Sequence, residues 1–382
     1  MTDTRLVLVT GLNRQATGWV ANRLLKEEPG TVLVDHDLRA LAEGIVRRHV
    51  RWGTHTEEET LELAHGCVSC TLREDTLPLL WRLTARADVR RIVLRLDPGM
   101  EPEPVCWNLH NALVGDTTIA SRAAVEAVVA VVDEGEWLTA ATGDEALGLT
   151  PDDDCTLAQV AVGQVEFADA VVLVGQAEDG WAAAQTAAVL DRLAPLAPRG
   201  VTVRGLLAKL PDNARRGAIS DAHDPLLRGC PPLEPDSGVA LTVFEARRPF
   251  HPVRLHRAMD VLLAGVVRTR GRLWVATQPD VALWLESAGG GLRVGHAGAW
   301  LAAVGDETWQ RASPERQVKA ALEWHPRWGD RVQEIAILSH DASPGHVHAT
   351  LRDALLTDDE LAADWEHYPD PFTTREPSED KA

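Results

Sequence analysis

The sequence has few lysines, few cysteines and no long apolar run. Only four lysines occur among its 38 basic residues, which is typical of a GC-rich genome and indicates no particular chemistry. The five cysteines are scattered and do not resemble the disulfide framework of a small secreted domain. No apolar stretch reaches the about 20 residues of a membrane-spanning helix, and the N-terminal residues do not read as a signal peptide. We therefore expect a cytoplasmic protein with no direct membrane contact.

Acidic residues outnumber basic ones, 57 to 38, for a net charge of −19. Such a charge disfavours non-specific binding to nucleic acid or to anionic membranes. We therefore expect no broad nucleic-acid binding. Any association with a ribosome would pass through a protein partner or a local basic patch.

The chain of 382 residues is long enough for two domains, each with its own core. Strands alternate with helices over residues 1–205, which predicts an α/β domain with a parallel sheet flanked by helices. Prolines are frequent in residues 206–238, which read as a linker. Residues 239–372 predict a smaller α+β domain, and the charged residues 373–382 predict a disordered tail.

Other segments carry local structural predictions. Residues 39–64 read as mixed helix and loop, with Glu57, Glu58 and Glu59 on a solvated helix face. Residues 289–291 are all glycine and lie between predicted strands, so they indicate a hairpin turn rather than a phosphate-binding loop. The second domain contains seven tryptophans, which favour packing inside the domain over a partner-binding face.

A segment beginning at Gly11 stands between a predicted strand and a predicted helix, the place of a phosphate-binding loop of the pattern G-x-x-x-x-G-K-S/T. In that pattern the lysine reaches the phosphates and the hydroxyl holds Mg²⁺. Here Ala16, Thr17 and Gly18 occupy the last three positions. Arg14 could supply charge, and a helix N-terminus attracts anions. The candidate nucleotide-binding residues are Gly11, Arg14, Thr17 and Gly18, although a turn that only keeps the shape of such a loop is the favoured interpretation.

Cys67 and Cys70 form a C-x-x-C motif, and His65 lies two residues upstream. Thr71 and Glu74 fit a capping box, so the cysteines are expected on a turn at a helix N-terminus, which favours the thiolate. With His36, which follows a predicted strand, they offer up to four nitrogen and sulfur donors for tetrahedral zinc. A redox pair, or two reduced thiols without a role, are the alternatives.

These segments together resemble the CobW-like P-loop GTPases, a family linked to metal delivery. Residues 66–75 resemble its G-C-x-C-C-T-L-R-x-D segment, with Ser69 replacing the middle cysteine. Residues 95–102 are similar to its E-T-T-G-L-A-D-P segment, residues 131–133 to its V-V-D element, and the block from residue 239 to its C-terminal domain. The resemblance implies a P-loop NTPase-like domain followed by a CobW C-terminal domain.

The residues that would grip GTP in that family are missing. Thr17 occupies the position of the lysine, and Gly18 occupies the position of the residue with the hydroxyl. Pro98 occupies the position of the glycine near the γ-phosphate. Residues 174–177 occupy the place of the N-K-x-D segment that recognises guanine. Proline offers no backbone N–H, and nucleobase recognition needs a placed hydrogen-bonding group. We therefore expect weak or no hydrolysis, with zinc rather than GTP as the candidate cofactor.

The cysteine turn and residues 250–292 look closest to an actinobacterial branch described as recruiting a ribosome hibernation factor during zinc starvation. This resemblance implies an adaptor that docks such a factor onto the small ribosomal subunit. The alternative is a GTP-dependent zinc metallochaperone, as in the wider family. A thiol redox role is a third interpretation.

Overall fold

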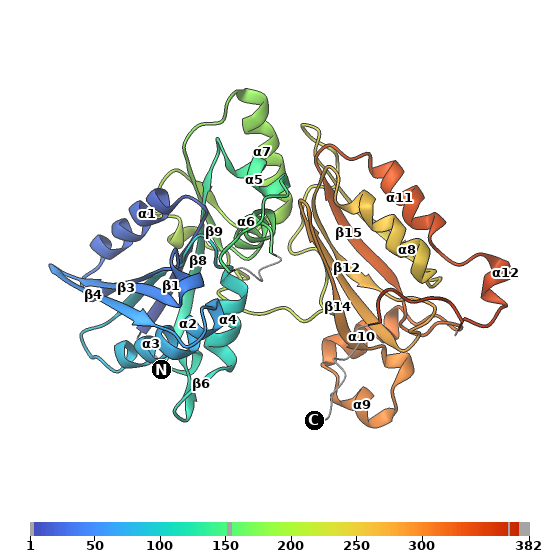
Figure 1. Cartoon of the computed structure of the whole chain (residues 1–382), viewed down its shortest axis with the longest axis horizontal. Helices are drawn as coiled ribbons and strands as arrows, with labels where there is room; N and C mark the ends of the chain where they lie inside the picture. Colours follow the sequence, from blue (N-terminus) through green and yellow to red (C-terminus); the bar gives the residue numbers. More distant parts are fainter. Residues whose placement is uncertain (1–3, 151–154, 366, 374–382) are drawn as a thin grey trace. The chain divides into compact units, whose positions relative to one another are not determined.

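Figure 1 shows the computed structural model, which describes residues 4–150, 155–365 and 367–373. The chain divides into two units, residues 1–220 with 228–232 and residues 221–227 with 233–382. The segment 206–238, predicted as a linker, thus contributes to both units. The predicted tail lies outside the described residues, apart from Thr373. None of the described helices is long and apolar enough to cross a membrane.

The first unit contains an eight-stranded sheet in the order β10-β9-β8-β1-β5-β2-β3-β4. Its inner strands β1, β2, β5, β8 and β9 run parallel, and β10 continues this arrangement at one edge. They are short apolar runs buried on both faces, as expected of a parallel sheet covered by helices. The bounds are β1 (Thr4–Thr10), β2 (Thr31–Asp37), β3 (Ile45–Trp52), β4 (His55–Glu62), β5 (Arg91–Arg95), β8 (Ala123–Asp133), β9 (Ala170–Val174) and β10 (Arg199–Gly200).

Helices cover both faces of this sheet. Alternate residues of β1 enter two different cores: Leu6 and Leu8 pack with α3 and α4, whereas Val7 and Val9 pack with α1. The bounds are α1 (Arg14–Glu27), α2 (Val68–Thr71), α3 (Leu77–Thr84), α4 (Pro102–Asn111), α5 (Trp137–Thr142), α6 (Leu157–Glu166) and α7 (Gly180–Leu193), with a small ribbon of β6 (Leu113–Val114) and β7 (Thr117–Thr118).

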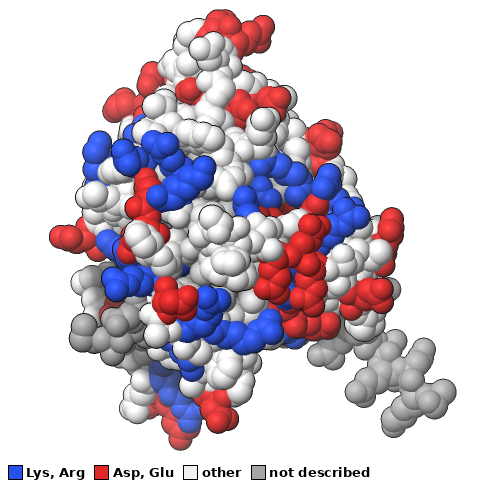
Figure 2. All heavy atoms as spheres, turned by 90° about the vertical axis from the view of Figure 1, so that its left-hand side faces the viewer, with Lys and Arg blue, Asp and Glu red and all other residues white. Residues whose placement is uncertain are grey.

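Residues 45–62 form an antiparallel hairpin of β3 and β4, so the prediction of helix and loop for this segment was wrong. Glu57, Glu58 and Glu59 lie on an exposed edge strand and not on a helix. Because almost all side chains of β4 are exposed, its sequence lacks the alternation of apolar and polar residues that predicts a strand. Charges on an edge strand oppose pairing with other chains. Figure 2, which faces this side of the molecule, shows acidic and basic side chains intermixed.

The second unit contains a five-stranded antiparallel sheet in the order β11-β15-β12-β13-β14. Leu255 of α8 and Leu351 of α11 pack on one face, against Ile335 and Ile337. The bounds are β11 (Ala240–Ala246), β12 (Val266–Leu273), β13 (Val281–Ala288), β14 (Gly291–Ala299), β15 (Gln333–Ser339), α8 (Pro252–Ala258), α9 (Asp306–Arg311), α10 (Pro314–Leu322), α11 (Pro344–Asp353) and α12 (Asp358–Leu361).

One prediction for this unit is confirmed, and a second is confirmed for two of its seven tryptophans. The glycines at 289–291 connect β13 to β14 in a hairpin, and Gly289 has a φ of 50°, a left-handed conformation that favours glycine. Trp274 and Trp300 are buried in a small core with Ala282 and Val332, so their role is packing. Trp324 differs, with 46% of its surface exposed.

Candidate functional site

Gly11 and three aspartates of the first unit lie at the carboxyl ends of the parallel strands. Gly11 follows β1, Asp97 follows β5, and Asp37 and Asp133 end β2 and β8. Parallel strands end at one edge of the sheet, and ligand sites of such folds lie there. A cavity of about 840 Å³ opens at this edge, between the β1–α1 turn, the end of β8 and α5.

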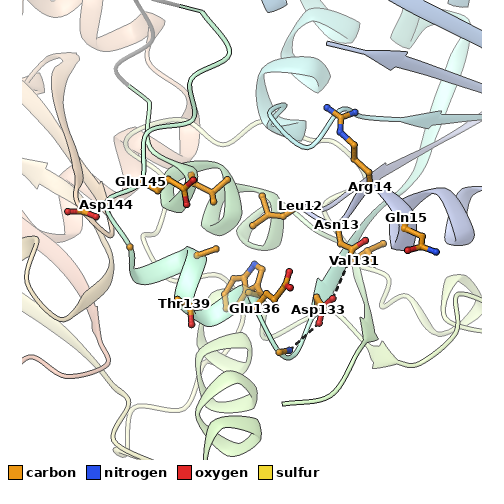
Figure 3. Close-up of a pocket in the computed structure, with 15 residues that line it drawn as sticks. Leu12, Asn13, Arg14, Gln15, Val131, Asp133, Glu136, Thr139, Asp144 and Glu145 are labelled. Carbon is orange, nitrogen blue, oxygen red and sulfur yellow. Dashed lines mark hydrogen bonds between the residues drawn. The ribbon is translucent and has the colours of Figure 1, made fainter. Parts of the chain in front are cut away.

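The turn from β1 into α1 is only three residues long. Gly11 has a φ of 152°, and a Cβ there would overlap the carbonyl oxygen of Val131, so the position requires glycine. Asn13 caps the helix: its Oδ1 accepts from the backbone N–H of Ala16 at 3.0 Å. Its Nδ2 donates to Asp133 Oδ2, also at 3.0 Å, as Figure 3 shows. One helix N-terminal N–H is therefore satisfied by the chain itself.

Thr17 and Gly18, the positions of the lysine and the hydroxyl in a phosphate-binding loop, already belong to α1. Thr17 is buried, and its Oγ1 donates to the carbonyl oxygen of Arg14 at 3.2 Å. A Cβ at Gly18 would lie 2.9 Å from Nη1 of Arg95, so this glycine makes room for the arginine. Of the four predicted nucleotide-binding residues, Arg14 lines the cavity and the other three do not.

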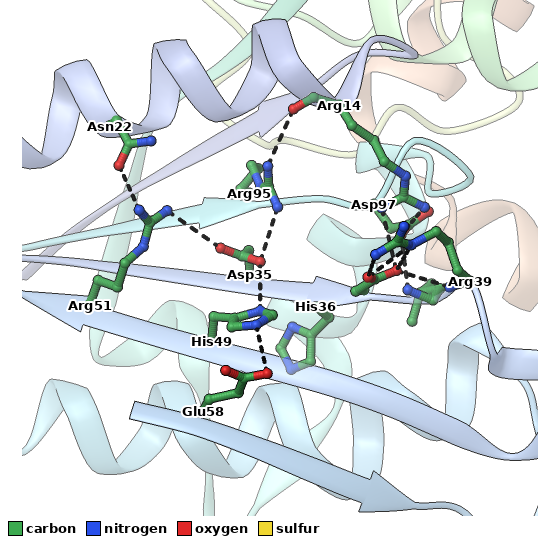
Figure 4. Close-up of polar contacts among 12 residues, drawn as sticks. Arg14, Asn22, Asp35, His36, Arg39, His49, Arg51, Glu58, Arg95 and Asp97 are labelled. Atoms are coloured by element: carbon green, nitrogen blue, oxygen red, sulfur yellow. Dashed lines mark hydrogen bonds and ion pairs between the residues drawn. The ribbon is translucent and has the colours of Figure 1, made fainter. Parts of the chain in front are cut away.

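Arg14 is held by carboxylates of the same unit (Figure 4). Its Nη2 lies 2.7 Å from Oδ2 of buried Asp97, and its Nη1 lies 3.6 Å from Oδ1 of Asp37. Asp97 also accepts from the N–H groups of Leu38 and Gly99. The hydrogen bond from Arg39 is the main reason why the pKa of Asp37 falls to about 2, and the charge of Arg14 adds to it. Both carboxylates are thus partners of arginine.

Arg95 is paired in the same way. Its Nη2 donates to Oδ1 of buried Asp35 at 3.0 Å, and its Nη1 donates to the carbonyl oxygen of Arg14 at 3.3 Å. Asp35 lies also near His49, at 3.3 Å, and near Arg51, at 3.7 Å. Two cations at this edge that could meet a phosphate, Arg14 and Arg95, are therefore both bound to internal carboxylates.

The cavity is mainly apolar and acidic. Asp133, Glu136, Asp144 and Glu145 line it beside one arginine, with Leu12, Val131, Trp137 and Leu157 among the apolar residues (Figure 3). Carboxylates repel a triphosphate. Together with buried Thr17 and the capped N–H of Ala16, this lining does not fit the grip of a phosphate-binding loop on a magnesium nucleotide.

The two motif cysteines lie at a helix start, as predicted. Cys67 is the N-cap of α2, and its Sγ accepts from the N–H of Cys70 at 3.0 Å. The two sulfur atoms are paired as a disulfide, with Cα atoms 5.2 Å apart. The predicted capping box of Thr71 and Glu74 was wrong, because the helix begins at Val68. Thr71 is instead buried and donates to the carbonyl oxygen of Cys67.

His36 is buried on β2 and contacts Asp75, with 2.7 Å between Nε2 and Oδ2. Asp75 also pairs with Arg48, which in turn pairs with Glu59 on β4. Burial opposes ionisation of Asp75, but the hydrogen bond from His36 and the charges of His36 and Arg48 outweigh it, so the pKa of Asp75 is lowered. The imidazole therefore ties the helical segment after the cysteines to the sheet.

The four predicted metal ligands are not gathered at one point. Cys67 and Cys70 are together, His65 is exposed just upstream, and His36 is engaged with Asp75. Within the described ranges, no group of three or more His, Cys, Asp or Glu side chains is arranged to hold a metal ion. Metal binding by the two cysteines remains a prediction.

Sequence reasoning did not single out several residues of this site. Asn13 carried a readable signal, since asparagine just before a helix is a preferred cap. Arg48 carried none, and Asp75 was noted only as the last residue of the cysteine motif, because their pairing depends on the β3–β4 hairpin.

The comparisons with known proteins agree with this architecture. Residues 31–198 match the family model of the CobW/HypB/UreG nucleotide-binding domain, and residues 239–355 match that of the cobalamin synthesis protein CobW C-terminal domain. A Mycobacterium tuberculosis protein named zinc chaperone Rv0106 is 45% identical over 97% of this chain and 92% of its own length. A Dictyostelium discoideum protein named zinc-regulated GTPase metalloprotein activator 1 is 24% identical over 85% of this chain and 72% of its own.

Among solved structures, the Zn(II)-bound YjiA GTPase from E. coli is 15% identical, with a TM-score of 0.40, over 93% of this chain and 100% of that one. The predicted fold class, a P-loop GTPase-like α/β domain followed by a smaller CobW C-terminal domain, is confirmed. The C-terminal domain is the one built on the antiparallel sheet. On the strength of the two family models and the 45% identical relative, this chain belongs to the CobW/HypB/UreG family.

Proposed function

We propose that this protein is a zinc chaperone that carries the metal on Cys67 and Cys70. The observation behind the proposal is that the chain places these two sulfur atoms side by side at a helix start. The relatives named zinc chaperone and zinc-regulated GTPase metalloprotein activator support the same assignment. A cytoplasmic location, where thiols stay reduced, is part of the proposal.

The chemistry of carriage follows from the small number of ligands. In the reduced protein both sulfur atoms can act as thiolates, which the helix N-terminus and the N–H of Cys70 favour. Zinc prefers four ligands, so two sulfur atoms leave two positions for water or for the side chains of an acceptor. An incomplete shell suits a cargo that has to leave, whereas a closed structural site would retain it.

Hydrolysis of GTP is not part of this function as we propose it. Thr17, which is buried, stands at the lysine position and Gly18 at the hydroxyl position, and Arg14 is paired with Asp97 and Asp37. We infer that GTP with Mg²⁺ binds weakly or not at all. Isothermal titration at millimolar nucleotide, with phosphate release measured in parallel, tests this, and rapid magnesium-dependent release would refute it.

Zinc titration into the reduced full-length protein, read out with a competing chromophoric chelator, tests the main proposal. We expect one equivalent to bind and the Cys67→Ser and Cys70→Ser variants to lose it. Cys230→Ser is the matched control, since Cys230 is an exposed cysteine outside the motif. Equal zinc affinity in all four proteins would overturn the assignment.

A second candidate is an adaptor that recruits a ribosome hibernation factor to the small ribosomal subunit when zinc is scarce. The observation that favours it is the internal pairing of Arg14 and Arg95, because an adaptor needs a stable binding scaffold and no hydrolysis. Co-sedimentation with ribosomes, with and without the factor, tests it. If neither protein changes the sedimentation of the other, this candidate fails.

A further inference from the structure

The second unit has an apolar groove that the cysteine site does not use. The groove measures about 760 Å³. It lies between α10, the edge strand β11 and the segment 225–227, all within one unit. Its aliphatic side chains are Leu226, Leu227, Val243, Val318 and Leu322. A groove lined by exposed aliphatic side chains is a candidate site of interaction.

The aliphatic ridge of α10, formed by Val318 and Leu322, is not required by the packing of the unit. The two residues are one helical turn apart, so they lie on the same face, and they are 58% and 83% exposed. The helix is held by other residues: Ala320 is buried and Lys319 pairs with Glu334 at 3.2 Å. The side chains of Val318 and Leu322 are therefore not needed to hold α10 in place and can contact a partner.

Carboxylates surround the groove. Glu245, Glu315, Glu323 and Glu334 line it beside a single cation, Lys319. Glu334 is neutralised by Arg272 and Lys319. Within the part of the chain that the structure describes, the other three glutamates form no ion pair. An apolar floor with uncompensated negative charge at its rim is complementary to a surface that combines aliphatic and basic side chains.

We propose that this groove docks a basic amphipathic α-helix of a partner protein. An amphipathic helix can enter such a groove with its own apolar face against Val318 and Leu322 and its basic side chains against the glutamates of the rim. The charge argues against a second copy of this chain as occupant, since its net charge is −19 and equal rims would repel. The inference rests on the proposed function, in that it names the chemistry of the protein to which the carrier or adaptor docks.

The test uses the full-length protein and a fluorescent synthetic peptide of about four helical turns, with leucines on one face and lysines flanking them. A peptide of the same composition with the leucines scattered, and one with glutamates replacing the lysines, are the comparators. We expect anisotropy to show at least about tenfold tighter binding of the first peptide, weakening as salt is raised.

Leu322→Glu and Glu323→Lys should each weaken binding of that peptide at least about tenfold, an effect expected of anchor and charge-pair residues. Leu113→Glu is the matched control, because Leu113 is 69% exposed and lies in the other unit. All three positions are exposed, so circular dichroism spectra and melting temperatures should match those of the unaltered protein.

Equal binding of the amphipathic and scattered peptides would overturn the proposal, as would equal effects of Leu322→Glu and Leu113→Glu. A dimer in sedimentation that Leu322→Glu converts to a monomer would also overturn it, since the occupant would then be a second copy. Zinc binding by Leu322→Glu separates the two proposals. That variant should keep its zinc, and Cys67→Ser should keep the peptide.

Discussion

Replacing Asp75 by asparagine should destabilise the first unit more than any comparable change at its surface. The carboxylate is the shared partner of His36 and Arg48, and the side chains of Arg48 and Asp75 are only 4% and 9% exposed. Removing one partner of a buried ion pair costs about 3–5 kcal/mol, because the other charge stays buried without compensation. Arg48 keeps its contact with Glu59, so we expect the lower end of that range, about 3 kcal/mol.

Urea denaturation of the full chain, followed by circular dichroism, measures this loss. Asp88→Asn is the control: it removes the carboxylate from an exposed ion pair with Arg86 in the same unit, and exposed pairs contribute little. The double variant Arg48→Met/Asp75→Asn should recover part of the stability, because the unpaired guanidinium is gone. The reasoning is refuted if Asp75→Asn shifts the urea midpoint no more than Asp88→Asn does. It is also refuted if the loss in free energy of unfolding of the double variant equals the sum of the losses of Arg48→Met and Asp75→Asn.

Three further predictions concern other residues. Gly11→Ala should destabilise the first unit by about 1–3 kcal/mol in the same urea assay, since the φ of 152° and the carbonyl oxygen of Val131 both exclude a Cβ; an unchanged midpoint would contradict the turn geometry. The pKa of Asp37 is lowered from 3.8 to about 2, so its ionisation stabilises the fold above pH 3.8 and this stabilisation is lost as the pH falls toward 2. Asp37→Asn should therefore reduce the change in melting temperature between pH 3.8 and pH 2. An equal change in the variant and in the unaltered protein would count against the Arg39 and Arg14 contacts. Burial raises the pKa of Cys106 to about 12, so iodoacetamide at a pH of about 8 should label exposed Cys230 and spare Cys106 until urea is added. Peptide mass spectrometry would show which cysteines are labelled. Rapid labelling of Cys106 in the native protein would contradict its burial.

The sequence predicted the central sheet well, because its strands are continuous apolar runs followed by turns and helices. It failed at β3 and β4, where the edge strand His55–Glu62 is exposed along nearly its whole length and lacks the alternation that identifies strands. That error carried into the site. Without the hairpin, nothing indicated that Arg48 would approach Asp75 and that Asp75 would in turn engage His36.

The sequence predicted that several candidate residues follow strands and so lie at one edge of the sheet, but it did not predict how they pair. Arg14 could be recognised as a cation near a helix start, yet its two carboxylate partners come from the ends of β2 and β5. Which of several charged residues meet across a sheet edge depends on register and loop conformation, which a single sequence does not specify.

The contacts of Arg14 have a consequence for how such a protein is regulated. One side chain joins the segments that follow three neighbouring strands, and in a nucleotide switch these are the segments expected to rearrange when the terminal phosphate leaves. If the ion pairs hold these segments together, turnover of a bound nucleotide no longer sets the timing of activity. Under the proposed function, timing would then depend on how much of the protein the cell makes and on whether Cys67 and Cys70 are oxidised, empty or loaded with zinc.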